Sequence, residues 1–126
     1  MPSASKTSAA RAASGPGYEG HFGELGDYTV AFEQFTSGGD MAPLFRGLPD
    51  DRCQTPHWGV VLKGRLTFTY ADSEDVIEAG KAYYAPPGHT TAADPGTETI
   101  EFSPTEELGK TMAVVMKNAA AVGAGA

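Results

Sequence analysis

The chain has 126 residues and a formal net charge of -7, with nine Lys and Arg against sixteen Asp and Glu. This length suits one domain built around a single packed core. Because nucleic acids and anionic membranes are recognised by clustered Lys and Arg, the charge excludes nucleic acid as a partner and argues against a membrane surface.

Residues 1–20 are rich in Ala, Ser, Gly and Pro and have no apolar periodicity. Such a segment buries too little surface to offset its ordering entropy, so it is predicted to be a disordered tail. Residues 21–118 are expected to form the folded domain. Residues 119–126 are predicted to be a flexible tail, although their alanines also suit an extension of a preceding helix.

Short strand patterns separated by Gly, Pro and Asp turns fill the region between the tails. In one of them, Leu66, Phe68 and Tyr70 alternate with polar residues and would share one face of a strand. Many short strands at regular spacing predict an all-β sandwich or barrel. The expected strands are residues 28–35, 41–45, 58–63, 66–70, 74–78, 82–85, 89–92 and 98–102.

One helix is predicted after the last strand. Ser103-Pro104-Thr105-Glu106 provides an N-cap serine, a proline at the first helical position and the glutamate of a capping box. We expect this helix to start near Pro104 and to cover one end or face of the β-structure. Its apolar residues repeat at helical spacing, at Leu108, Met112, Val115 and Met116.

The cellular compartment is predicted from cysteine usage and from the apolar segments. Cys53 is the single cysteine, which excludes an internal disulfide and fits a reducing compartment. No apolar run approaches the ~20 residues that cross a bilayer, and the amino terminus lacks the apolar core of a secretory signal. We therefore expect a cytoplasmic protein.

Two segments, about two dozen residues apart, each combine a metal-competent side chain with a strand pattern and a Gly or Pro turn. The first segment runs from Asp51 to Gly64. It resembles, in degenerate form, the first motif of the cupin superfamily of small β-barrels, Gly-x5-His-x-His-x3-4-Glu-x6-Gly. With Gly64 on the closing glycine, His57 falls at the family's glutamate, Cys53 at its second histidine and Asp51 at its first.

The second segment runs from Gly80 to His89 and resembles the second cupin motif, Gly-x5-Pro-x-Gly-x2-His-x3-Asn. Gly80, Pro86 and Gly88 keep the family spacing. The family's histidine position falls on Thr91, whereas His89 lies two residues earlier. The resemblance covers about residues 28–102.

The resemblance implies an antiparallel jelly-roll β-barrel, here with one carboxy-terminal α-helix. It also implies a divalent metal ion inside the barrel, held by residues of both motifs, and a small organic ligand or substrate. If the protein is an enzyme, the family implies a metal-dependent oxygenase, isomerase or lyase. Cupins commonly dimerise, so the resemblance also implies a homodimer.

The side chains at the altered motif positions are themselves good ligands, and the candidate metal ligands are Cys53, His57 and His89. Thiolate and imidazole together favour zinc first, then iron, nickel or copper. Three protein ligands leave a coordination position open for water or substrate. Residues four apart on an ideal strand lie ~13 Å apart, so Pro56 or a bulge near it must fold the segment before Cys53 and His57 can converge.

Each candidate ligand also has a structural interpretation. Cys53 suits a buried small hydrophobe, and His57 suits a hydrogen bond to a neighbouring backbone group. His89 follows a Pro-Pro-Gly turn and suits an exposed loop. His21 is expected to be a bystander next to the tail, and Asp51 a solvated turn acid.

Other side chains are open to more than one role, and no catalytic residue is assigned. Glu98 and Glu101 lie on opposite faces of the last strand, so at most one points inwards, where it would suit a general base. A nucleophile pair of Cys53 with a histidine lacks a helix N-terminus or basic cluster to lower the thiol pKa. Four aromatic residues are expected in the core or at the rim, where some would line a pocket: Trp58, Phe68, Tyr83 and Tyr84.

Two functions remain open. The first is a metal-binding barrel that acts on or binds a small organic molecule. The second is a barrel without metal that binds a small ligand or serves as a sensor or accessory protein. The absence of the family's own histidines favours the second function.

Overall fold

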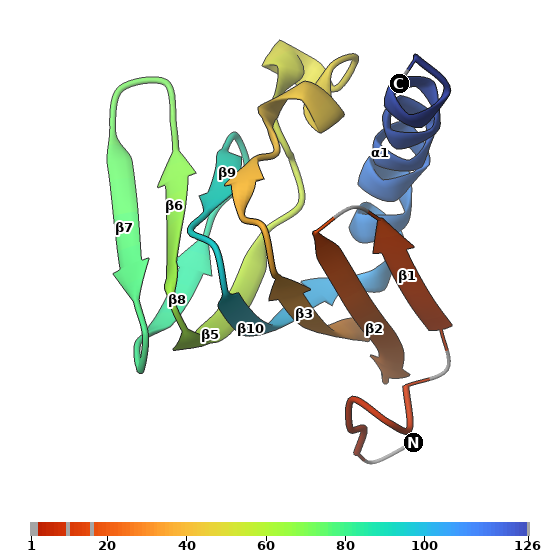
Figure 1. Cartoon of the computed structure of the whole chain (residues 1–126), viewed down its shortest axis with the longest axis vertical. Helices are drawn as coiled ribbons and strands as arrows, with labels where there is room; N and C mark the ends of the chain where they lie inside the picture. Colours follow the sequence, from red (N-terminus) through yellow and green to blue (C-terminus); the bar gives the residue numbers. More distant parts are fainter. Residues whose placement is uncertain (1–2, 10, 16, 126) are drawn as a thin grey trace.

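The computed structural model describes residues 3–9, 11–15 and 17–125. Over these residues, two antiparallel β-sheets are followed by one long carboxy-terminal helix (Figure 1). Side chains of both sheets meet in one buried cluster, with Phe35 and Val61 from one sheet and Leu66, Phe68 and Ile77 from the other. The predicted all-β class, with an antiparallel barrel and a carboxy-terminal helix, is confirmed.

The first sheet has six strands, paired in the order β1-β2-β3-β10-β5-β8. β5 lies between β10 and β8, with His57 opposite Ala85 of β8. This places the first residue of β5 beside the chain segment that follows β8. The strands are β1 (Arg11–Gly15), β2 (Tyr18–Leu25), β3 (Tyr28–Phe35), β5 (His57–Lys63), β8 (Ala82–Ala85) and β10 (Thr97–Pro104).

The second sheet has four strands in the order β4-β9-β6-β7. Leu66 and Phe68 point into the core from β6, with 2% and 1% of their surface exposed, and Tyr70 packs partly against the same cluster. The alternation predicted for residues 66–70 is therefore confirmed. The strands are β4 (Gly39–Asp40), β6 (Arg65–Thr69), β7 (Glu74–Glu78) and β9 (Thr90–Ala93).

The predicted strand at residues 41–45 is wrong. The structure has a 3₁₀ turn there, η1 (Ala42–Phe45), and a second one follows at η2 (Pro49–Asp51). Each turn has a proline at one of its first positions, where the missing N–H is not needed. The Leu44 N–H donates to the Met41 carbonyl, which closes the turn locally instead of joining a sheet.

The amino-terminal segment differs from the disordered tail predicted for residues 1–20. β1 pairs with β2 and β2 pairs with β3, so residues 11–15 and 18–20 belong to the six-stranded sheet. Tyr18 packs on Phe35 with ring centroids 5.4 Å apart. The small residues of this segment have no apolar alternation, so backbone pairing and one aromatic contact place it without a pattern in the sequence.

The carboxy-terminal helix is α1 (Thr105–Gly125), which extends beyond the predicted end of the domain at residue 118 and includes residues predicted as a flexible tail. The alternative interpretation, that the alanines extend the helix, agrees with the structure. Asn118 anchors the helix on η1 by donating to the carbonyls of Leu44 and Arg46, at 2.7 and 2.8 Å. Neither α1 nor any other described helix has the length and apolarity needed to span a membrane.

Ser103 does not serve as the predicted N-cap, because it lies in β10 and its hydroxyl group contacts His57.

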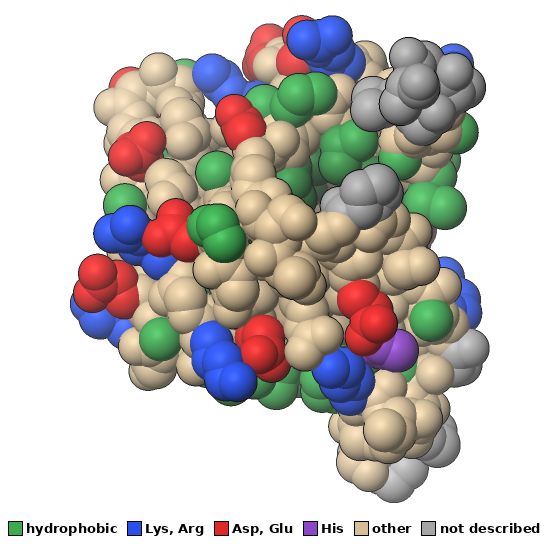
Figure 2. All heavy atoms as spheres, viewed as in Figure 1, with side chains coloured by type: hydrophobic (Ala, Val, Ile, Leu, Met, Phe, Trp, Pro, Cys, Tyr) green, Lys and Arg blue, Asp and Glu red, His purple; other side chains and the backbone are tan. Residues whose placement is uncertain are grey.

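Charged side chains of both signs are mixed on the face of the molecule in Figure 2. On the face shown in Figure 2, Lys and Arg lie among Asp and Glu and form no separate basic patch.

Gly64, which closes the first motif, is needed for both its conformation and its size. Its φ is +78°, and a Cβ there would lie 2.4 Å from the Thr97 hydroxyl oxygen and 2.7 Å from the Thr97 Cα. Thr97 is fully buried and its hydroxyl group is bonded to backbone atoms of Arg65 and Asp94, so it has no room to move. Gly80 has a similar φ of +88° but open space around it.

We therefore predict that Gly64→Ala lowers the free energy of unfolding by about 2–4 kcal/mol, from strain plus overpacking. Gly80→Ala, the matched control, should cost about 1–2 kcal/mol, from strain alone. Urea unfolding of both variants measures the difference. Equal losses would show that the contact with Thr97 is unimportant.

Candidate metal centre

The two sequence motifs are joined by backbone hydrogen bonds at the candidate site. Cys53 lies between η2 and β5 and forms an isolated antiparallel bridge with His89. The Cys53 N–H donates to the His89 carbonyl at 2.8 Å, and the Gly88 N–H donates to the Cys53 carbonyl at 2.8 Å. Gly88 has a φ of +96°, so the Pro-Pro-Gly turn needs its glycine to bring His89 to this position.

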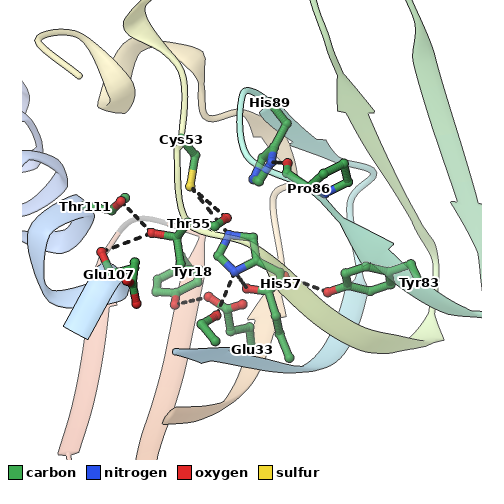
Figure 3. Close-up of polar contacts among 12 residues, drawn as sticks. Tyr18, Glu33, Cys53, Thr55, His57, Tyr83, Pro86, His89, Glu107 and Thr111 are labelled. Atoms are coloured by element: carbon green, nitrogen blue, oxygen red, sulfur yellow. Dashed lines mark hydrogen bonds and ion pairs between the residues drawn. The ribbon is translucent and has the colours of Figure 1, made fainter. Parts of the chain in front are cut away.

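The three candidate ligands converge inside the barrel (Figure 3). The Cys53 Sγ lies 3.5 Å from the His57 Nε2. One potential ligand atom from each of Cys53, His57 and His89 lies within 4.8 Å of the other two. The chain between Cys53 and His57 is thus not an extended strand, and the bend that the sequence required near Pro56 is present.

Hydrogen bonds to the two imidazole rings leave the Nε2 atoms as the candidate ligand atoms. The His89 Nδ1 lies 2.7 Å from the Pro86 carbonyl, which only accepts, so Nδ1 carries the proton. The His57 Nδ1 lies 2.7 Å from the Ser103 hydroxyl oxygen and 3.4 Å from a Glu101 carboxyl oxygen. When Nδ1 carries the proton and donates, the Nε2 of each neutral ring keeps a lone pair that can coordinate a metal ion.

His89 Nε2 is a buried polar atom without a hydrogen-bond partner among the described residues. Leaving such an acceptor unpaired costs about 1–3 kcal/mol. The ring is held tightly, since Phe68 and His57 pack against it with centroids 5.3 and 5.1 Å away. A lone pair without a partner among the described residues, beside a thiol and a second imidazole, suits coordination of an electrophile such as a metal ion.

Burial sets the protonation states of the candidate ligands. Cys53, His57 and His89 are 2%, 7% and 0% exposed. Loss of solvent lowers the pKa of both His57 and His89 to about 4, so both rings are neutral at pH 7. Burial, with a smaller contribution from Glu101, raises the pKa of the Cys53 thiol. An unactivated thiol argues against the nucleophile pair considered from the sequence.

Helix α1 positions the loop that carries Cys53. Within this loop, Thr55 is fully buried, and its hydroxyl group lies 2.6 Å from that of Thr111 and 3.2 Å from the Glu107 carbonyl oxygen (Figure 3). These contacts tie the loop before β5 to the first turns of the helix. The helix therefore supports the candidate site and does not merely cover the sheet.

Two buried carboxyl groups lie on the interior face next to His57. The Tyr83 hydroxyl donates to Glu101 at 2.7 Å, and the Tyr18 hydroxyl donates to Glu33 at 2.5 Å. Burial raises the pKa of Glu101 to about 7 and, with repulsion from Glu101, that of Glu33 to about 8. Burial and the neighbouring carboxyl groups also raise the pKa of both tyrosines.

Sequence reasoning considered Glu101 and missed Glu33 and Tyr18. Glu33 falls on the same alternating face of β3 as Thr29, Ala31 and Phe35, all of which are buried, and that pattern was the available signal. Tyr18 lies in the segment that was predicted to be a disordered tail.

The remaining candidates from the sequence lie elsewhere. Glu98 points outwards and pairs with Lys63 at 3.3 Å, so of the two glutamates on β10 only Glu101 faces the interior. Asp51 accepts the Gly47 N–H at 3.0 Å in an exposed turn, as a turn acid would. His21 pairs with Glu19 at 2.9 Å. Phe68 and Tyr83 belong to the core, whereas Trp58 and Tyr84 are exposed on the outer face.

The buried groups predict how the stability of the metal-free protein depends on pH. Glu33 and Glu101 bind protons more tightly in the folded state, so their contribution to stability is lost as pH rises from ~4.5 to ~8. His57 and His89 bind protons less tightly in the folded state, so their contribution is lost as pH falls from ~6.5 through ~4. Between pH ~6.5 and ~8, the carboxyl groups act alone.

We therefore expect the free energy of unfolding to fall from pH ~6.5 to ~8 in the presence of a chelator, and the fall to shrink in Glu33→Gln. Urea unfolding at several pH values measures this slope. Glu98→Gln, which changes an exposed glutamate, serves as the control and should keep the slope. An unchanged slope in Glu33→Gln would contradict a buried, proton-binding Glu33.

Comparison with known proteins identifies the fold only through structure. No protein-family model matches the sequence, and no curated protein matches it. A protein of unknown function from Rhizobium leguminosarum has a TM-score of 0.58 and 18% identity, over 82% of this chain and 95% of that one. AerE from Microcystis aeruginosa has a TM-score of 0.58 and 13% identity, over 77% of this chain and 46% of AerE.

An RmlC-like cupin from Shewanella frigidimarina has a TM-score of 0.52 and 18% identity, over 75% of this chain and 83% of that one. The present chain thus spans 95% and 83% of two of these proteins and less than half of AerE. Two packed antiparallel sheets, two linked motifs at one end of the barrel and these matches agree with the resemblance read from the sequence: the chain has the cupin fold.

Proposed function

We propose that the protein binds a divalent metal ion through Cys53, His57 and His89 and that it binds or transforms a small organic molecule in the barrel. The observation that carries the proposal is the convergence of three buried donor atoms. Both imidazole rings use Nδ1 in other hydrogen bonds, and the Nε2 of His89 has no partner among the described residues.

The geometry of the donors suits a tetrahedral ion. Zn–S and Zn–N distances of about 2.3 and 2.0–2.1 Å put sulfur and nitrogen about 3.6 Å apart. The Cys53 Sγ and the His57 Nε2 are 3.5 Å apart in the protein. All three candidate ligand atoms lie within 4.8 Å of one another. One thiolate and two imidazoles favour zinc, with iron, nickel or copper as alternatives.

A bound ion with three protein ligands would supply a Lewis acid and an open coordination position. The residues of this chain would orient the site. Ser103 and Glu101 accept from the Nδ1 side of His57 and so keep its Nε2 free for coordination. Tyr83 in turn holds the Glu101 carboxyl group in place. If the protein is an enzyme, this arrangement fits metal-dependent oxygenase, isomerase or lyase chemistry, and the buried free thiol fits a reducing cytoplasm.

We predict that His57→Ala and His89→Ala each lower the metal content of the purified protein at least about tenfold. His21→Ala, which changes the third histidine, should not alter it, because His21 pairs with Glu19 outside the cluster. Elemental analysis of protein purified without a histidine tag and dialysed against zinc measures this. Circular dichroism of each variant checks that the barrel is folded. A variant that is folded and still loaded would remove that residue from the site.

Metal affinity should depend on pH mainly through the Cys53 thiol. Because the pKa of both histidines is already about 4, these rings do not compete for protons above pH ~5. The thiol must lose one proton to bind the ion, so the metal affinity should fall about tenfold for each unit by which the pH is lowered. Titration with cobalt measures the slope, and Cys53→Ser should abolish both the slope and the thiolate-to-cobalt absorption. A slope of zero would exclude thiolate ligation.

A second candidate function, a small-ligand-binding or sensor barrel without metal, is favoured by the burial of the site. His89 is fully buried, and each of the three candidate ligands has less than a tenth of its surface exposed. Thermal unfolding with added zinc or iron separates the two functions. Metal in less than about a tenth of the chains and no gain in melting temperature would favour the metal-free function.

A homodimer is also part of the proposal, with a second copy covering the outer face of the six-stranded sheet. Trp58, Val60, Leu62 and Phe102 project from β5 and β10 on this face and are 36–50% exposed. The nearby charges Lys63 and Glu98 neutralise each other. In a chain of net charge -7, such a face lets two copies approach without bringing like charges together.

We predict that Leu62→Glu converts the dimer to a monomer, because it places a charge at the centre of the contact. Val76→Glu is the matched control, since Val76 is 45% exposed on β7 of the other sheet. Sedimentation velocity over a range of protein concentrations measures both. A wild-type protein that stays monomeric at high concentration would remove the dimer from the proposal.

A further inference from the structure

An open hollow of about 420 Å³ lies between the β6–β7 turn and the end of β8, outside the core. Its volume is that of a small organic molecule. The hollow is adjacent to the candidate metal centre, because the Pro86 carbonyl accepts from His89 and the Tyr70 ring lies 6.1 Å from the His89 ring. Its walls include Tyr70, Asp72, Glu74, Asp75, Tyr84 and Pro86.

Two aromatic rings line the hollow. Tyr84 is 51% exposed, and Trp58 stacks on it with centroids 5.1 Å apart and planes 23° apart. The Trp58 stack holds the Tyr84 ring in place from outside the hollow. Tyr70 is held edge-on against His89 at 73°. Aromatic faces held in this way offer a negative quadrupole to a positively charged guest.

The charged side chains that line the hollow are all negative. Asp72, Glu74 and Asp75 contribute carboxyl groups, and none of its lining residues is Lys or Arg. Within the described part of the chain, none of these three acids forms an ion pair. Glu74 is fixed by a 3.4 Å hydrogen bond from Thr69. Uncompensated carboxylates around an apolar wall attract cations and repel anions.

We propose that this hollow binds a small organic cation, an ammonium group on an apolar body. The ammonium group would lie against the faces of Tyr70 and Tyr84 and among the carboxylates, and the apolar body would lie along Pro86. A small, strongly hydrated inorganic ion would gain less from the aromatic walls, because it would have to lose water to reach them, and an organic anion would be repelled. The inference goes beyond the metal proposal and does not depend on it, although an occupant would lie one side chain away from a candidate ligand.

The test is calorimetric titration of the whole chain with choline and phenethylammonium. Their neutral counterparts, 3,3-dimethylbutan-1-ol and 2-phenylethanol, have nearly the same shape without the charge. We expect each cation to bind at least about tenfold more tightly than its neutral counterpart. Its affinity should decrease as salt is added. The fluorescence of Trp58 should change on binding, because it is the single tryptophan and stacks on Tyr84.

Matched variants locate the site. Tyr84→Leu and Asp75→Asn should each weaken binding of the cations at least about fivefold. Glu78→Gln removes an equal charge from the same strand as Asp75, but Glu78 does not line the hollow, so it should leave binding unchanged. Circular dichroism confirms that each variant is folded.

Three results would overturn the proposal. The first is equal affinity for the cations and their neutral counterparts, or no binding of either. The second is an equal loss in Glu78→Gln and Asp75→Asn, or binding of magnesium as tight as that of the cations, which would indicate only a diffuse acidic surface. The third is loss of binding in Cys53→Ser, which would place the occupant in the interior. Retained binding in Cys53→Ser separates this site from the metal proposal, whichever way that one is decided.

Discussion

The backbone pairing of Cys53 with His89 is the constraint on which the rest of the site depends. It continues the pairing of β5 with β8 beyond the first residue of β5, His57, which is itself opposite Ala85. The sheet therefore holds the two motifs side by side before any side chain is considered. Because the pairing spaces the chains as in a sheet, the three donor side chains meet without a long or mobile loop. The convergence of the three donor groups at this position is a consequence of strand order.

The barrel accommodates several polar groups in its interior because nearby side chains form hydrogen bonds with them. Tyr83 and Tyr18 satisfy the two buried glutamates, and the hydroxyl groups of Thr55 and Thr111 satisfy each other. A glycine also provides the space that one of these tyrosines needs. A Cβ at Gly59 would lie 2.6 Å from the Tyr83 hydroxyl oxygen, so only glycine lets this tyrosine lie across β5 to reach Glu101. A polar interior of this kind costs stability and specifies one arrangement of side chains.

The sequence predicts the parts of this structure that depend on local pattern. Short strands bounded by turns, such as residues 74–78 and 82–85, and the turns around Gly64 and Gly80, follow from residue type alone. It does not predict β1 or β2, because β1 is placed by pairing with β2, and β2 by pairing with β3, and not by an apolar pattern. Ser103 has the local signal of an N-cap, yet the ring of His57, 46 positions away in the sequence, takes its hydroxyl group.

The candidate site was predictable in its members but not in its environment. Cys53, His57 and His89 stand out as metal-competent residues, and motif spacing groups them. Their convergence depends on the bend near Pro56 and on the bridge to His89, which are properties of the fold. Glu33 was hidden because a glutamate in a strand is more often a solvated residue, and only the buried neighbours on its face indicate otherwise.

A bound cation at the site would explain why carboxyl groups are buried beside it. Neither Glu33 nor Glu101 has a Lys or Arg partner in the described part of the chain. A divalent ion bound to one thiolate and two neutral imidazoles leaves one unit of positive charge in a medium of low dielectric constant. Glu101, 3.4 Å from the Nδ1 of His57, lies where a compensating negative charge is needed, and Tyr83 and Ser103 hold that arrangement. The same carboxyl group that burial keeps partly protonated in the metal-free barrel would thus become the counter-charge of the loaded one. The metal proposal therefore accounts for two features at once: the lone pair of His89, which has no partner in the described part of the chain, and the acidic interior beside it.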